Sequence, residues 1–109
     1  MAKFMILYRS AMGASDRMEN STPEDMQASM GEWMKWSENL SDGVTLEWGL
    51  PLQFRHHFGA EAAESDVSGY SILEAESKDA VHKAIEAHPH LKEEGASIDA
   101  LELLPMPGM

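Results

Sequence analysis

The amino-acid sequence predicts an α+β domain in which two helices cover one face of an antiparallel sheet. Three observations lead to this prediction. Four short segments have the composition of strands, two longer segments have helical periodicity, and their order along the chain is β-α-β-β-α-β. That order is the ferredoxin-like, split-βαβ sandwich. With 109 residues, 43% of them hydrophobic, the chain can form one core, so we expect a single domain over residues 1–109.

The predicted strands are Lys3–Arg9, Val44–Gly49, Ser68–Glu76 and Ser97–Leu104. Successive side chains of a strand point to opposite faces of the sheet, and the first strand is apolar on both. Phe4, Ile6 and Tyr8 share one face, and Met5 and Leu7 share the other. Because the helices can cover only one face, we expect a second copy of the chain to cover the other, giving a homodimer.

The first helix is predicted within residues 21–43, with Thr22 as N-cap, Pro23 at its first position and Gly43 as a left-handed C-cap. Its spacing predicts one buried face made of Met26, Met30, Trp33, Met34, Ser37 and Leu40.

The second helix is predicted to begin at Ser77 and to be ended by Pro89. Its inner face is expected to carry Val81, Ala84, Ile85 and His88.

Two connections are longer than the fold requires, Ser10–Ser21 and Leu50–Val67. The stretch "QFRHHF" (Gln53–Phe58) in the second could add a short strand. The acidic stretch Gly59–Asp66 has few apolar anchors, so we expect it to be mobile.

Composition excludes several functions. The chain has 19 acidic and 8 basic residues, a net charge of −11, which disfavours nucleic acid and anionic membranes as partners. No apolar run is long enough to span a bilayer, and cysteine is absent, so we expect a cytoplasmic protein. The sequence lacks G-x-G-x-x-G, Walker A, G-x-S-x-G and H-E-x-x-H motifs, so no cofactor and no metal are expected.

The stretch "EAHPHLKEEG" (Glu86–Gly95) is the most distinctive local pattern, because a proline separates two histidines. One interpretation is a helix stop, with His88 partly buried and bonded to the last helical carbonyls. The other is a titrating site, for which His90, expected to be exposed beyond Pro89, is the better candidate. Arg9 ends an apolar strand, and it is either an ordinary surface residue or an anchor for an anionic ligand.

Several segments together resemble the YCII-related proteins, also called the DGPF family. They are "KFMILYR", "GVTLEWGLPL", "VSGYSILEAESKDAV" and "HPHLKEEGASIDALELLPMPG", which together extend over most of the chain. The resemblance implies a ferredoxin-like domain that pairs as a dimeric α+β barrel, with the "HPHL" stretch at a sheet edge bordering the dimer cleft. It also implies a bacterial protein, in some cases encoded beside extracytoplasmic-function sigma factors.

The chain departs from that family at its proposed catalytic pair. The helix histidine falls at Glu32 or Trp33, and the Asp-Gly step corresponds to Glu47 and Trp48. A carboxylate is retained without its imidazole partner, so the pair does not transfer intact.

Two functional hypotheses follow. The first is an enzyme performing acid–base chemistry, such as isomerisation or elimination, on a small organic acid or phenol in the cleft. His90, His88 and Glu47 would be catalytic, and Arg9 and Tyr8 would anchor the substrate. The second is a non-catalytic ligand-binding or accessory protein of a stress or sigma-factor-linked pathway, which the missing helix histidine favours.

Overall fold

The computed structural model describes residues 2–11, 14–60 and 65–108. Along the chain these form β1 (Ala2–Arg9), α1 (Ala14–Asn20), α2 (Pro23–Glu38), β2 (Thr45–Pro51), β3 (Val67–Ala75), α3 (Lys78–Glu86), the 3-10 helix η1 (Pro89–Lys92) and β4 (Ser97–Glu102). The protein is therefore α+β, as the sequence predicts, and its element order is compatible with the ferredoxin-like plan. The chain adds one short helix, α1, that the sequence analysis did not anticipate.

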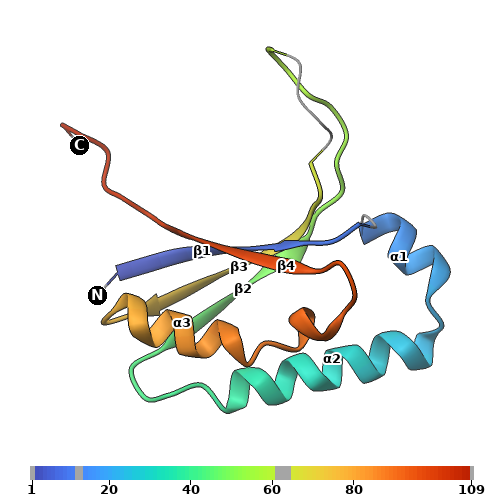
Figure 1. Ribbon diagram of the computed structural model, residues 1–109, viewed down its shortest axis with the longest axis horizontal. Coiled ribbons are helices and arrows are strands. Elements are labelled where there is room, and N and C mark those ends of the chain that lie inside the picture. Colours follow the sequence, from blue (N-terminus) through green and yellow to red (C-terminus); the bar gives the residue numbers. More distant parts are fainter. Residues whose placement is uncertain (1, 12–13, 61–64, 109) are drawn as a thin grey trace.

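The four strands form one sheet in the order β2-β3-β1-β4, and all three strand pairings are antiparallel. The first strand lies in the interior of the sheet, with Ile6 opposite Ser71 of β3 on one side and Ala100 of β4 on the other. Helices α2 and α3 lie together on one side of this sheet (Figure 1). The most apolar strand of the sequence thus occupies one of the two positions, with β3, that are flanked by strands on both sides.

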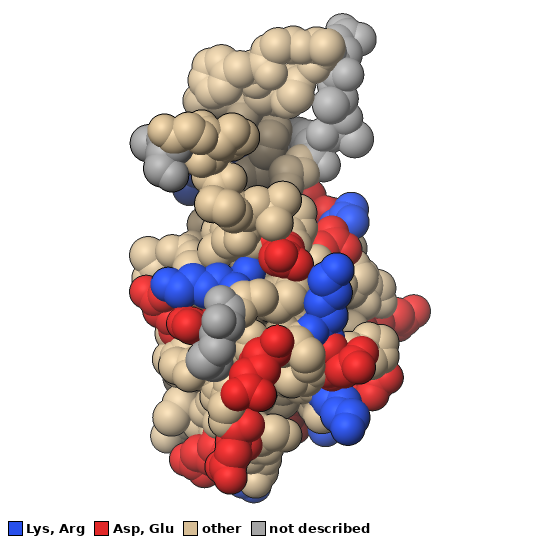
Figure 2. Space-filling model, turned by 90° about the vertical axis from the view of Figure 1, so that its left-hand side faces the viewer, with Lys and Arg blue, Asp and Glu red and all other residues tan. Residues whose placement is uncertain are grey.

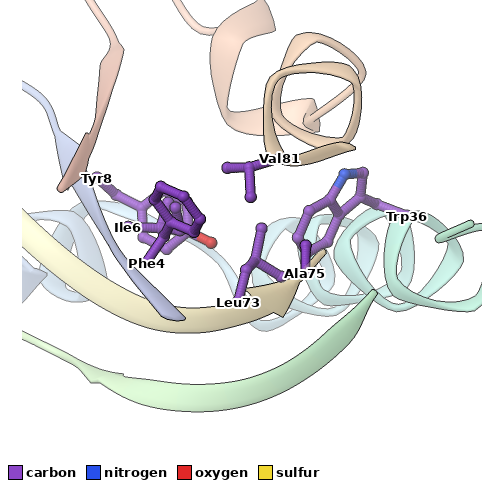
Figure 3. Packing of buried hydrophobic residues seen from close by; sticks show 7 residues of the cluster. All are labelled: Phe4, Ile6, Tyr8, Trp36, Leu73, Ala75 and Val81. Carbon is purple, nitrogen blue, oxygen red and sulfur yellow. The ribbon is translucent and has the colours of Figure 1, made fainter. Parts of the chain in front are cut away.

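The core lies between the sheet and the helices. Figure 3 shows its buried side chains converging from β1, β3, α2 and α3; they are Phe4, Ile6, Tyr8, Trp36, Leu73, Ala75 and Val81. The indole Nε1–H of Trp36 donates to the carbonyl of Ala84 at 2.8 Å, which joins α2 to α3. The alternation of β1 is confirmed, because Phe4, Ile6 and Tyr8 are buried while Met5 and Leu7 are only partly buried on the outer face.

Both predicted helix starts are confirmed by their caps. The hydroxyl of Thr22 accepts from the N–H of Asp25, and the Asp25 carboxylate accepts from the N–H of Thr22, which completes a capping box. Ser77 caps α3 by accepting from the N–H of Ala80. The predicted end of the first helix is wrong, because α2 ends at Glu38, and Gly43, with φ of 88°, serves the turn before β2 instead.

The predicted buried stripe of α2 is also wrong over most of its length. Met26, Met30 and Met34 are exposed, and the buried residue is Trp36, which the stripe did not include. Trp33 and Leu40 from the predicted set do pack on the core. The residues that pack on the core, Trp33, Trp36 and Leu40, follow the i, i+3, i+7 spacing of one face near the C-terminal end of α2. Met34 lies off this face, and Met26 and Met30 lie closer to the start of the helix than any of its core residues.

The long connection after β2 does not contain the extra strand proposed for Gln53–Phe58, because that segment has no regular secondary structure. The described residues 52–60 leave the end of the sheet as an extended arm on the side away from α2 (Figure 1). Part of the stretch expected to be mobile, residues 61–64, lies outside the described residues.

The outer face of the sheet carries an apolar patch. Met5, Leu7, Tyr70 and Ile72 are partly buried there, and Leu101 of β4 is exposed. Within the part of the chain that the structure describes, no helix lies over this face. The sequence predicted that a second copy of the chain covers this face, and no described residues of the chain itself form a layer over it.

Gly49 determines how closely β2 approaches β3 before the arm departs. A Cβ at this position would meet the Tyr70 carbonyl oxygen and lie 2.6 Å from the Tyr70 ring. We expect Gly49→Ala to destabilise the protein by about 1–3 kcal/mol, because the backbone must shift to relieve this overlap. Urea unfolding monitored by circular dichroism measures the change.

The matched control is Gly31→Ala within α2, where nothing lies within 4 Å of the added carbon. This substitution is expected to stabilise the protein by about 0.5–1 kcal/mol, because alanine is the better helix former. Equal effects of the two substitutions would contradict the close-approach argument.

Candidate functional site

The "HPH" stretch forms a tight corner between α3 and β4. His88 follows the end of α3, and Pro89 opens the 3-10 helix η1. Proline has no N–H, so the first donor after the corner belongs to His90, and it donates to Nδ1 of His88 at 3.0 Å. His88 therefore caps the helix that follows it. The sequence predicted that the His88 side chain would bond the last carbonyls of α3, and that prediction is wrong.

This hydrogen bond fixes the proton of the His88 ring. Because Nδ1 accepts, the neutral ring must carry its hydrogen on Nε2. The side chain is 1% exposed, and burial, with a smaller contribution from His90, lowers its pKa to about 3. His88 is thus a neutral hydrogen-bond donor at ordinary pH. It cannot serve as a protonated acid there.

The Nε2–H of His88 has no hydrogen-bond partner within the described part of the chain. Its surroundings are aromatic, with ring centroids of Trp36, Trp33 and Tyr8 at 4.2, 4.5 and 4.9 Å. A buried donor left unpaired costs about 1–3 kcal/mol, and such groups are uncommon in folded proteins. Among the described residues, this Nε2–H is the buried side-chain polar group that lacks a partner.

Trp33 and Trp36 belong to an aromatic cluster, Tyr8, Trp33, Trp36, Trp48, His88 and His90, whose outer member is Trp48 of β2. The Trp48 ring centroid lies 6.2 Å from that of Trp33 and 6.3 Å from that of Trp36. Trp48 is 45% exposed, so it forms the boundary between the cluster and solvent. The sequence analysis missed Trp36 and Trp48, although the chain has only three tryptophans and all three are in this cluster.

His90 is buried, at 6% exposure, so the expectation that it would lie exposed in a loop is wrong. Its Nε2 lies 3.0 Å from the carbonyl of Arg9, and since a carbonyl only accepts, His90 is the donor. This bond draws the ring against the end of β1. On its other side, Nδ1 lies 3.9 Å from the carboxylate of Glu93, which is paired with Arg17 of α1 at 2.6 Å.

Tyr8 faces the same cluster, but its hydroxyl is already engaged. It lies 2.7 Å from the hydroxyl of Ser71 on β3. Burial raises the pKa of Tyr8 to about 12, against the opposing effect of the Ser71 hydrogen bond. Tyr8 therefore remains protonated and acts as a packing surface for the two histidine rings.

The structure does not bring Arg9 and Glu47 to this cluster. Arg9 follows Tyr8, and its guanidinium lies on the outer face, bound to Asp66 at 2.7 Å and to Asp99 at 3.1 Å. The hydrogen bond to Asp66 is the main cause of a raised Arg9 pKa. Glu47 precedes Trp48 and stands opposite Ile72, again on the outer face. Of the five predicted site residues, Tyr8, His88 and His90 converge, and the other two lie across the sheet.

Among the described residues, no group of three or more histidine and carboxylate side chains is placed to hold a metal ion. In the same residues, no helix is long and apolar enough to cross a membrane.

The buried neutral imidazole predicts a specific pH dependence of stability. Unfolded, the ring has its ordinary pKa of 6.5, and folded about 3, so between these values the unfolded state binds the extra proton and stability falls as the pH falls. Between pH 7 and pH 5 we expect the wild type to lose about 2 kcal/mol more than the His88→Gln variant. Urea unfolding at both pH values measures this difference. His82→Gln, at an exposed position of α3, should behave as the wild type.

Comparisons with known proteins do not assign the chain to a group. No family model, no curated protein and no solved structure matches it. The resemblance to YCII-related proteins accordingly stays a prediction from the sequence.

Proposed function

We propose that this protein binds a small organic molecule at the aromatic cluster, with the His88 Nε2–H as the hydrogen-bond donor that recognises it. The observation that carries this proposal is the buried donor without a partner in the described structure. A ligand oxygen placed on it would satisfy the donor and recover the cost of its burial. The resemblance to YCII-related proteins supports the same class of function.

The surroundings of His88 favour a neutral ligand. The rings that contact it are Trp33, Trp36, Tyr8 and His90, and the nearby cation, Arg9, directs its side chain to the other face of the sheet. A carboxylate would lose its hydration here without gaining a positive partner. Phenols and aryl ketones offer a neutral oxygen together with a flat ring that can stack on the indoles. Within the organic acids and phenols that the sequence suggested, we therefore favour phenols and related carbonyl compounds.

Access to the donor involves the edge of the cluster. The Nε2 atom is covered, and Trp48, which contacts Trp33 and Trp36, is the most exposed ring of the cluster. An exposed side chain at a sheet edge changes rotamer at low cost, so Trp48 is the ring we propose to move when the ligand enters.

Acid–base catalysis is the second candidate function, and one observation favours it. The Glu93 carboxylate lies 3.9 Å from Nδ1 of His90, which is longer than a hydrogen bond, and a side-chain movement that closed this gap would give an imidazole–carboxylate pair of the kind that serves general bases. His88 has a different role in this candidate, because a neutral donor polarises a carbonyl without giving up its proton. Turnover of a bound ligand, lost in Glu93→Gln, would distinguish this candidate from binding alone.

We also propose that the functional unit is a homodimer, in which the outer faces of two ferredoxin-like sheets pack together as a dimeric α+β barrel. The apolar patch around Leu7 and Ile72 supports this, because solvent would otherwise contact it. The patch lies across the sheet from His88, so pairing leaves the aromatic cluster on the helix side.

Intrinsic fluorescence tests the ligand proposal directly, because all three tryptophans belong to the cluster. Neutral phenols and aryl ketones are titrated against the corresponding benzoic acids, and we expect saturable quenching by the neutral compounds only. His88→Phe keeps a ring of similar shape, but it removes both the Nε2–H donor and the Nδ1 acceptor of the His90 N–H. With the fold verified by circular dichroism, we expect it to weaken binding by about tenfold.

His82→Phe is the matched control, since the same substitution is made at an exposed ring of α3. It should bind as the wild type does. Equal affinity of the wild type and the His88→Phe variant would rule out His88 as the recognising group.

Light scattering at micromolar concentration tests the dimer, and we expect about twice the chain mass of 12.1 kDa. Ile72→Lys should shift the protein to the monomer, because it places a charge in the apolar patch. The new lysine stands opposite Glu47 in the sheet, so the fold should tolerate it. A wild type that remains monomeric would contradict the pairing.

A further inference from the structure

We infer that the arm of one protomer docks on the exposed methionines of α2 in the second protomer, beside the aromatic cluster of that protomer. The arm consists of the described residues 52–60. The methionine face consists of Met26, Met30 and Met34. The inference rests on the proposed homodimer and adds a defined contact to it.

The arm buries Leu52 and Phe54 only partly, and its outer residues 55–60 are exposed. Phe58 is 86% exposed, and the described part of the arm has no regular structure to hold it. Leu52, Phe54, Phe58 and Val67 line part of an open hollow of about 430 Å³ at its base. Figure 2 shows that this projecting part of the molecule is almost free of charged side chains, in contrast to the body below it.

The methionine face is likewise an apolar surface that is exposed to solvent. Its three side chains recur at intervals of four residues, so they form one ridge along α2, and the central one, Met30, is 64% exposed. Methionine side chains are flexible and polarisable, and surfaces made of them adapt to apolar partners. A ridge of this kind fits an open apolar hollow.

The charges of the two surfaces also match. The helical segment 14–38 contains six acidic and two basic residues, whereas residues 52–60 contain Arg55, His56 and His57 and no acid. In a chain of net charge −11, a segment that carries Arg55 and no acidic residue is not repelled by the acidic surface of a second copy.

The contact forms between protomers, because the arm points away from its own α2. It leaves the end of the sheet and extends upward in Figure 1, whereas α2 lies below the sheet. A base contact reinforces this direction, since Gln53 accepts from the N–H of Ser15 at the start of α1 at 2.8 Å.

The contact would border the ligand site. Met30 and Trp33 are three residues apart on α2, so their side chains are neighbours on the helix surface. The Trp33 ring in turn contacts His88. The arm of the second protomer therefore lies where it can cover the open edge of the aromatic cluster and contribute Phe58 to it.

The absence of cysteine from the sequence makes a clean cross-linking test possible. Phe58→Cys and Met30→Cys are introduced into separate chains that differ in an affinity tag. The two are mixed and treated with a short bifunctional maleimide. We expect the mixed, doubly tagged dimer to form several-fold more than when Phe58→Cys is mixed with Leu104→Cys, a control at a similarly exposed apolar residue of the C-terminal tail.

A single chain that carries both Phe58→Cys and Met30→Cys tests the alternative, in which the arm contacts α2 of its own protomer. A cross-link within one chain, independent of protein concentration, would overturn the inference, because the arm would then reach its own helix. Equal yields with Met30→Cys and Leu104→Cys would also overturn it. The cross-linking experiment contains no ligand. If the cross-link does not form while light scattering shows an intact dimer, the proposed function and the outer-face pairing are unaffected.

A second measurement does not depend on cysteine placement. Sedimentation velocity over a concentration series should show that Met30→Glu and Phe58→Glu each weaken self-association by about tenfold, with Leu104→Glu unchanged. Glutamate is a good helix former, and both positions are exposed, so the fold is retained. Self-association that is unaffected by both variants would refute the docking.

Discussion

The hydrogen bond from the N–H of His90 to the ring of His88 is the interaction on which the arrangement of this site depends. It turns the chain after α3 and begins η1. It also selects the tautomer of His88 and places His90 against the end of β1. The proline between the two histidines is integral to this geometry, because it removes the donor that would otherwise compete. One local bond thus connects the shape of the corner to the chemistry of the ring.

The burial of His88 has an electrostatic consequence for the whole cluster. A charged imidazole between two indoles and a phenol would be poorly solvated, so the ring stays neutral. The same environment that removes its charge also leaves its remaining hydrogen without an acceptor in the described structure. The protein therefore keeps a polar group in apolar surroundings at an energetic cost, and such costs are commonly found at sites of function.

Features governed by neighbouring residues could be predicted from the sequence, and features governed by distant packing could not. The caps at Thr22 and Ser77, the alternation of β1 and the inner face of α3 each depend on a few consecutive residues. The methionines of α2 have helical spacing, but only the three-dimensional structure shows that the core packs against Trp33, Trp36 and Leu40 and leaves the methionines exposed. The outer-face position of Glu47 could have been predicted, because alternation along β2 places its side chain on the opposite face from that of Trp48. The proton state of His88 could not, because it depends on indoles from α2 and on a turn that no motif encodes.

The position of β1 affects how the chain can acquire its structure during synthesis. Its neighbours in the sheet are β3, where Phe4 meets Leu73, and β4, where Phe4 meets Glu102. This apolar segment leaves the ribosome before both of the strands with which it pairs. Until residues near the end of the chain emerge, "FMILY" remains an unpaired strand that other unfolded chains or chaperones can bind. Contacts over so long a sequence separation also slow folding. For this protein, the interval between translation and completion of the sheet is the period of greatest exposure to aggregation.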